Sequence, residues 1–517
     1  MIESRPISVL LATEGTYPFY GGGVSTWCHS LTHGLPEIDF TLLAVVTNPY
    51  PPVKYDLAPN VQSVVKVPQW GLLQPAEYSQ HQPPSIVLRN LWDTTERVLS
   101  ERFKPLFERL LELILSADCN VVELGHVFLG LQQYFQRYDY PRSMDSVEAW
   151  NVVQAAVRTH CDTPPNSVES PTLAEVKQAY RLLYHLLMVL HFPIPTEDLT
   201  HSSAASFCGL PCVLAKLAHG TPYLLTEHGV YLREQYLNLR SQIQSSFVRN
   251  FLFRLVENIV ALNYHFADQV SPVCAYNSRW EKHLGVSEER IQVIFNGVDP
   301  GKFHRYPAKR NLRPTVSNVG LLYPLKGQLD LIDAAARLRL RFPELEVRLY
   351  GSPSDLGYFE NCERKVAELR LEDTVTFAGP TKEPWTVYSS SDVMAFPSLS
   401  EGFPYVVLEA MLCGSAIVAT DVGGVAEALG DCGVLVPSRT PSAMADAVSL
   451  LLANPAECER LGRSAQARAL AFFTEERFLS AHRAAYRALS SRRLPRLVPA
   501  HFTAGEDQCE SLSLYAG

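Results

Sequence analysis

The stretch TVSNVGLLYPLKGQLDLIDAA, residues 315–335, decides the fold of this chain. Five strand-like residues come first, a turn with Gly320 and Pro324 follows, and a helical pattern completes the unit. The unit repeats, with strands expected at 315–319, 346–350, 374–378, 393–396, 416–420 and 433–436. Regular alternation of strands and helices predicts a parallel sheet that has helices on both faces.

The first half of the chain repeats the pattern less regularly. We expect its strands at 7–13, 40–47, 121–124, 223–226, 269–273 and 291–295. Residues 50–195 interrupt the pattern with helices at about 90–117 and 172–190, and we interpret this region as an elaboration of the first domain. Asn296-Gly297 and Pro300-Gly301 are turn signals, so the two sheets are expected to meet within IFNGVDPGKF, 294–303.

The expected fold class is therefore α/β, with two doubly wound, Rossmann-like domains that face each other. The N-terminal domain is expected at 1–295 and the C-terminal domain at 296–473. A helix over 474–490, with Thr474 as its N-cap, could return to the N-terminal domain, and 491–517 form a tail.

Composition narrows the class of protein. The chain has 517 residues, of which 47% are hydrophobic and 19% are charged, as is usual for globular proteins. A net charge of −9 argues against a nucleic-acid partner. Eleven cysteines without paired spacing, and no leader-like N-terminus, favour reduced thiols and a cytoplasmic location. No apolar run approaches the ~20 residues that a membrane span needs.

Two glycine- and charge-rich stretches follow strands of the first half. In TEGTYPFYGGGVSTW, 13–27, Gly22 and Gly23 precede a helix and could bring backbone N–H groups close to an anion. A plain turn would need only one glycine.

The second stretch, EHGVYLRE, 227–234, places His228 and Arg233 where a strand gives way to a helix, and we interpret both as site residues. The neighbouring THSSAASFCG, 200–209, offers His201 and Ser202, whose part in a site the sequence leaves open.

The second half supplies a cation and a set of glycine turns. Lys326 stands at the head of a helix, where an ammonium group suits a phosphate. Gly351 and Gly379 end two strands, and such turns can present bare backbone to a flat base.

The stretch SEGFPYVVLEAMLCG, 400–414, places two glutamates eight positions apart. Gly402, Phe403 and Pro404 form the turn between them, whose backbone N–H groups are expected to meet an anion or a sugar oxygen. Glu409 lies one helical turn further on, where a carboxylate can accept hydrogen bonds from two hydroxyls, as a ribose would offer. Glu401 at the edge of the turn can hold a sugar hydroxyl.

Together, Lys326 and the Glu401/Glu409 spacing resemble the retaining glycosyltransferases of family 4, which have the GT-B fold. EGTYPFYGGGVSTW and LLTEHGVYLRE further resemble PelF-like enzymes of Pel polysaccharide assembly. The resemblance implies that a hexose moves from a nucleotide sugar, UDP-glucose for PelF-like proteins, to a saccharide acceptor in exopolysaccharide biosynthesis. It also implies catalytic roles for His228, Lys326 and Glu401, and association with a membrane polysaccharide synthase complex. No metal or other cofactor is implied, and the chain has no Asp-x-Asp element.

One position departs from the family pattern. The family has Gly-Arg where this chain has Gly320-Leu321, so an arginine that would share the diphosphate charge is missing. Either another cation, such as Arg233, compensates, or the protein is a weakly catalytic sensor or assembly partner that binds a nucleotide sugar. An epimerase on the same fold is a third reading, but the sequence supplies no dedicated pair of bases for it.

Overall fold

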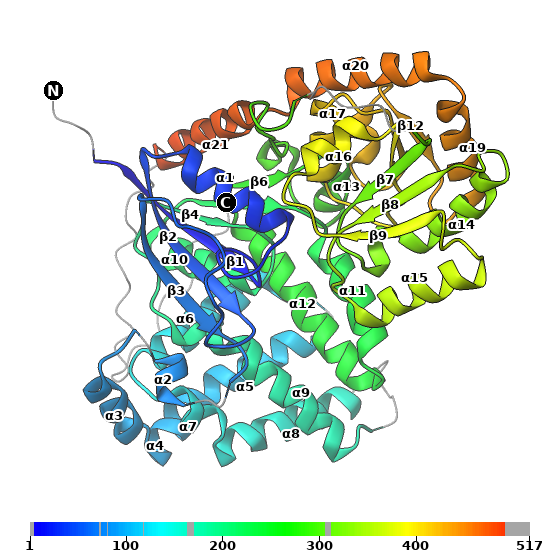
Figure 1. Ribbon diagram of the computed structural model, residues 1–517. Coiled ribbons are helices and arrows are strands. Elements are labelled where there is room, and N and C mark those ends of the chain that lie inside the picture. Colours follow the sequence, from blue (N-terminus) through cyan, green and yellow to red (C-terminus); the bar gives the residue numbers. More distant parts are fainter. Residues whose placement is uncertain are drawn as a thin grey trace.

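The computed structural model describes residues 5–71, 74–79, 81–116, 118–162, 170–304 and 312–491 (Figure 1). Two six-stranded parallel sheets organise the chain, in the orders β3-β2-β1-β4-β5-β6 and β12-β11-β10-β7-β8-β9. The first contains β1 (Ile7–Glu14), β2 (Ile38–Val46), β3 (Val61–Pro68), β4 (Leu199–Ser202), β5 (Tyr223–Glu227) and β6 (Gln269–Pro272). The second contains β7 (Thr315–Val319), β8 (Glu346–Tyr350), β9 (Val375–Gly379), β10 (Val393–Phe396), β11 (Ile417–Thr420) and β12 (Val434–Val436). The prediction of two doubly wound α/β sheets is confirmed.

Helices cover both sheets. Those of the first half outside the elaboration are α1 (Gly23–Gly34), α10 (Leu210–His219), α11 (Tyr231–Gln242), α12 (Ser246–Phe266) and α13 (Ala275–His283). The second half has α14 (Gln328–Arg339), α15 (Leu356–Glu368), α16 (Pro384–Ser390), α17 (Tyr405–Leu412), α18 (Val425–Leu429), α19 (Pro441–Leu452) and α20 (Pro455–Phe472). The central strands of both sheets are buried along most of their length, as expected of sheets covered on both faces, whereas β3, β8, β9 and β12 at or near the sheet edges are only partly buried.

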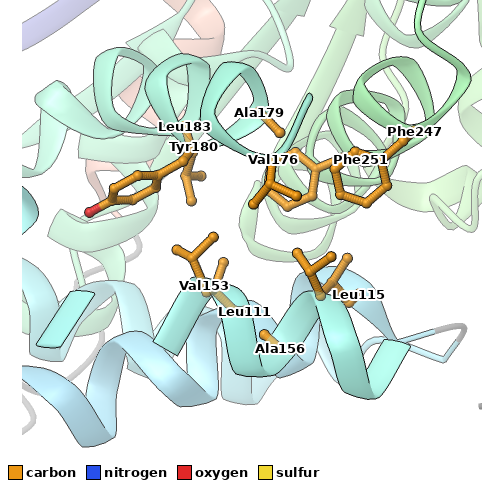
Figure 2. Close-up of a pocket in the computed structure, with 11 residues that line it drawn as sticks. Leu111, Leu115, Val153, Ala156, Val176, Ala179, Tyr180, Leu183, Phe247 and Phe251 are labelled. Carbon is orange, nitrogen blue, oxygen red and sulfur yellow. The ribbon is translucent and has the colours of Figure 1, made fainter. Parts of the chain in front are cut away.

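A block of helices below the first sheet in Figure 1 makes up most of the elaborated region. It contains α2 (Pro75–Tyr78), α3 (Pro84–Asp93), α4 (Glu96–Val98), α5 (Lys104–Leu115), α6 (Val121–Phe135), α7 (Tyr140–Met144), α8 (Val147–Asp162) and α9 (Leu173–Leu186). Figure 2 shows a pocket where α5, α8 and α9 of this block pack against α12. Its lining is apolar except for the hydroxyl of Tyr180, which donates to the carbonyl of Met144. The pocket is therefore part of the packing of the block.

The last described helix, α21 (Glu475–Ser490), packs against the first sheet although it follows the second in the chain (Figure 1). Thr474 caps it, because its Oγ1 accepts from the N–H of Arg477 at 3.4 Å. Phe478 and Tyr486 of α21 are buried in one apolar cluster with Trp27 of α1. Of the expected tail, 492–517 lie outside the described residues.

Two expected strands are wrong. Residues 121–124 form the first turn of α6, where the side chain of Asn120 caps the N–H of Glu123 at 3.1 Å. The apolar run there belongs to a 15-residue helix that buries one face. Residues 291–295 form no strand either, since only Ile291 pairs, through an isolated bridge to Val270. Conversely, β3 completes the first sheet at a position for which no strand was expected, and β4 leads into the stretch 200–209, which was expected to join a strand to a helix.

Candidate active site

The carboxyl ends of β5 and β10 meet where the two halves of the chain touch. Arg233 of α11 donates from Nη1 to the Oγ of Ser400 at 3.0 Å. Gly402 lies so close to the backbone of His228 that a Cβ at this position would overlap the His228 carbonyl oxygen. The loop that follows β11 closes on the same turn, since the N–H of Gly424 donates to the carbonyl of Gly402 at 2.8 Å. The structure thus brings together the stretches 227–234 and 400–404, which are far apart in sequence.

Lys326 and Glu401 form an ion pair beside this contact. The Nζ of Lys326 lies 2.6 Å from Oε1 of Glu401, and the hydroxyl of Ser398 donates to the same oxygen at 2.7 Å. The two side chains are 25% and 10% exposed, so the pair is largely shielded from water. Gly327, in the left-handed region with φ 68°, turns the chain from Lys326 into α14. The sequence assigned the two residues to different parts of a ligand but gave no sign that they pair.

Glu409 lies inside α17 and is held by a residue that the sequence analysis missed. The hydroxyl of Tyr388, on α16, donates to Oε2 of Glu409 at 2.7 Å. Burial raises the pKa of Glu409, while the Tyr388 hydrogen bond and the charge of Lys302 lower it in part. Tyr388 is itself buried. The hydrogen bond fixes one carboxylate oxygen and orients the group.

His228 is a neutral imidazole at the end of β5. Burial, with a smaller contribution from His482, lowers the pKa of His228 to about 3. Its ring lies edge-to-face with Trp27, at a centroid distance of 4.9 Å. Its Nε2 is covered and has no hydrogen-bond partner among the residues that the structure describes. A neutral ring at this position can donate or accept one hydrogen bond according to its tautomer.

His201, whose part the sequence left open, is structural. It is fully buried in β4, and both ring nitrogens have partners. Nδ1 lies 2.8 Å from the hydroxyl of Tyr486, and Nε2 lies 2.8 Å from Oγ1 of Thr226. Ser202 is likewise buried, with its hydroxyl 2.7 Å from that of Tyr223.

The glycine loop before α1 lies beside the start of α17. An ideal Cβ on Gly23 would be 3.7 Å from the ring of Tyr405, while one on Gly22 would meet nothing within 4 Å. The open space at Gly22 is where a ligand could approach this loop.

In the turn before α17, the side chain of Phe403 belongs to the hydrophobic core, and only its backbone N–H remains for a ligand. The ring of Phe403 is buried, stacked on Phe295 at 5.2 Å, and its carbonyl accepts from Asn296 at 2.7 Å. Phe403 can therefore offer a ligand only its N–H. Pro404 is the N-cap of α17 and has no N–H to donate, so it sets the turn without being a donor itself.

The glycines after β8 and β9 differ in their surroundings. A Cβ on Gly351 would overlap the carbonyl oxygen of Gly320, so the two turns touch. Gly379, with φ 71°, has no atom within 4 Å of an ideal Cβ. Leu321, beside these turns, is 44% exposed.

Comparisons with known families agree with the fold. Residues 7–289 match the family described as "Domain of unknown function (DUF3492)", and 302–468 match "Glycosyl transferases group 1". The first match covers more than half of the chain, so the chain belongs to the DUF3492 family, and its second half is similar to group 1 glycosyltransferases.

Curated relatives match over part of their length. A D-inositol 3-phosphate glycosyltransferase of Pseudarthrobacter chlorophenolicus is 38% identical over 182 residues, which are 34% of this chain and 40% of the relative. One of Kribbella flavida is 32% identical over 228 residues, 40% of this chain and 54% of the relative. The chain thus spans about half or less of the length of these relatives.

Solved structures match over nearly the whole chain. Sucrose-phosphate synthase from Thermosynechococcus elongatus has a TM-score of 0.59 and 18% identity, covering 94% of this chain and 100% of its own. HepE from Anabaena, solved in complex with UDP-glucose, has a TM-score of 0.56 and 17% identity, covering 93% and 100%. These likenesses establish the GT-B fold.

No helix in the described ranges is long and apolar enough to cross a membrane. The same residues contain no group of three or more His, Cys, Asp or Glu side chains placed to hold a metal ion.

Proposed function

We propose that this protein is a retaining glycosyltransferase that transfers a hexose, glucose in the first instance, from a UDP-sugar to a saccharide acceptor. The observation that carries the proposal is the Lys326–Glu401 ion pair at the strand ends of a GT-B fold, with Glu409 on α17, the helix that follows the Glu401 loop. The match of 302–468 to group 1 glycosyltransferases supports it. HepE, a structure of the same fold, was solved with UDP-glucose, which makes this sugar the first donor to test.

Each site residue has a role in this proposal. Lys326, at the start of α14, neutralises the diphosphate as it leaves, with glycine turns and helix N-termini contributing further N–H donors. Glu401 orients the donor sugar, and Glu409 accepts the ribose hydroxyls. Neutral His228 lines the reaction centre.

The reaction needs no protein nucleophile. The acceptor hydroxyl attacks the anomeric carbon from the face that the diphosphate leaves. The new C–O bond forms as the bond to the diphosphate breaks, and the proton of the hydroxyl passes to a diphosphate oxygen. The configuration is retained because attack and departure share one face.

The resemblance to PelF-like enzymes extends the proposal to exopolysaccharide biosynthesis. On that basis the protein works in the cytoplasm, beside a membrane polysaccharide synthase complex that receives its product. The acceptor is then a saccharide that binds mainly to the first half.

A second candidate is a nucleotide-sugar sensor, which the uncharged, exposed Leu321 favours. One experiment separates the two functions. Purified protein is screened against nucleotide sugars by thermal shift, and release of free nucleotide diphosphate is followed with a panel of saccharide acceptors. We expect UDP-sugar to raise the melting temperature and UDP to be released. Binding without release with any acceptor would favour the sensor, and no binding of any nucleotide sugar would refute both.

A further inference from the structure

The second half has two cations near the proposed donor site: Lys326 is paired with Glu401, and Lys302 acts on Glu409 at the proposed ribose end. A nucleoside diphosphate brings at least two negative charges, yet the ammonium of Lys326 already lies 2.6 Å from a carboxylate. The opposite charges of that pair cancel. The nearby turn at Leu321 adds an exposed apolar side chain instead of a cation. A diphosphate at this place needs another positive group.

Arg233 reaches this place from the other half of the molecule. Its guanidinium donates to the hydroxyl of Ser400, the residue directly before Glu401, at 3.0 Å. Burial raises the pKa of Tyr323, which lies three residues before Lys326. The nearby charges of Glu234 and Glu401 raise it further, so Tyr323 lies close to both carboxylates. The first turn of α11 therefore lies against both loops that flank the ion pair.

The partner of Arg233 in this structure is a neutral hydroxyl. A guanidinium has five N–H donors in a rigid fork that matches phosphate oxygens, so it can bind a diphosphate while the Ser400 contact persists or breaks. A diphosphate is the stronger acceptor because hydrogen bonds between ionised groups are roughly twice as strong as neutral ones.

We propose that Arg233 supplies the second cation of the diphosphate site, from the half of the molecule that does not otherwise hold the donor. Binding of the diphosphate then links α11 to the loops of the second half. Only the arrangement with the two halves in contact has both cations, Arg233 and Lys326, beside the donor. This inference rests on the proposed function, since it needs a nucleoside diphosphate at Lys326.

The test removes the positive charge of Arg233 from the first half and adds one at position 321 in the second half. UDP and uridine affinities are measured by calorimetry for the unmodified protein, Arg233→Ala, Leu321→Arg and the double variant, with thermal unfolding to check that each folds. Arg240→Ala, which removes an exposed arginine from the last turn of the same helix, is the matched control.

We expect Arg233→Ala to weaken UDP binding about tenfold or more and to leave uridine binding unchanged, because only UDP carries the charge. Leu321→Arg should restore most of the loss in the double variant. In the unmodified protein it should strengthen binding less than about tenfold, because Arg233 already fills the role. The Arg240→Ala control should bind UDP normally.

Three results would overturn the inference while leaving the proposed function standing. In the first, Arg233→Ala binds UDP as tightly as the unmodified protein. In the second, Arg233→Ala binds UDP and uridine more weakly by the same factor. In the third, the double variant binds UDP no more tightly than Arg233→Ala. If the unmodified protein binds neither UDP nor any other nucleoside diphosphate, the proposed function fails and the inference fails with it.

Discussion

Glu409 is the residue whose proposed role is easiest to isolate. Its Oε2 is occupied by the Tyr388 hydroxyl, which leaves the other oxygen of an oriented carboxylate for the ribose. We expect Glu409→Ala to weaken UDP and UDP-glucose equally, by ~1.5–3 kcal/mol, because both contain ribose. Calorimetry measures this, with Glu360→Ala, which removes an exposed carboxylate on α15, as the control. If the affinity of Glu409→Ala for UDP is unchanged, Glu409 does not bind the ribose.

Glu281 shows the cost of a buried acid without partners. It is 1% exposed, and neither carboxylate oxygen has a hydrogen-bond partner among the described residues. Burial raises the pKa of Glu281 from 4.5 to about 8. Between these pH values the folded protein keeps a proton that the unfolded chain releases, so this group lowers stability as pH rises.

The variant Glu281→Gln should therefore be more stable than the unmodified protein, and the gain should grow from pH 5 to pH 8. Each pH unit in this window contributes up to ~1.4 kcal/mol. Urea unfolding at the two pH values measures the gain. A gain of the same size at both, or a loss at pH 8, would mean that Glu281 is ionised in the folded protein.

At the scale of elements, the contact between the end of β5 and the turn after β10 sets how the halves meet. A methyl group at Gly402 would overlap the carbonyl of His228, so Gly402→Ala should push the loops apart without touching either sheet. We expect kcat/KM for sugar transfer to fall at least about tenfold, since small displacements of reacting groups are costly.

The control for Gly402→Ala is Gly220→Ala. Gly220 has φ 67° but no atom within 4 Å of an ideal Cβ, so alanine there adds backbone strain without a clash. Both variants should remain folded in thermal melts. If Gly402→Ala transfers sugar at the normal rate, the close contact is not required for the reaction.

The second sheet was predictable because each of its strands is a short apolar run between clear helical patterns. Three of its strands, at 315–319, 346–350 and 393–396, have the expected bounds. The first sheet was less predictable, since the apolar run at 121–124 fits a buried helix as well as a strand. Asn120, followed three residues later by Glu123, is a helix-start signal that the strand prediction passed over, and Asn120 does cap the helix.

The site was predictable where a motif follows a strand, and not where it depends on contacts between distant elements. Glu401 and Lys326 could be singled out from their positions in the two stretches. Three contacts of the site join residues that are 21 to 167 positions apart in the sequence. They are the Lys326–Glu401 ion pair and the hydrogen bonds from Tyr388 to Glu409 and from Arg233 to Ser400. No local pattern records such contacts.

At the scale of the whole molecule, the chain passes twice between its halves. It leaves the first sheet after β6, builds the second, and returns through α21. The ring centre of Trp27, on α1, lies 4.9 Å from that of His228 and 5.3 Å from that of His482, which is on α21. The returning helix therefore packs against the tryptophan that supports His228, which ties the C-terminal end of the fold to the candidate site.

The proposed roles of Lys326 and Arg233 also predict how sugar transfer responds to metal chelation. In the proposed site Lys326 and Arg233 carry the positive charge beside the diphosphate, and helix N-termini add N–H donors. We expect EDTA to leave sugar transfer unchanged and added Mn²⁺ or Mg²⁺ to change it less than about twofold, as measured by UDP release. Glu409→Ala, assayed beside the unmodified protein, gives the background rate of a protein with a damaged donor site. If EDTA instead abolished transfer and Mn²⁺ restored it, a divalent ion would be carrying the diphosphate charge. The two cations would then be supporting the loops and not the leaving group.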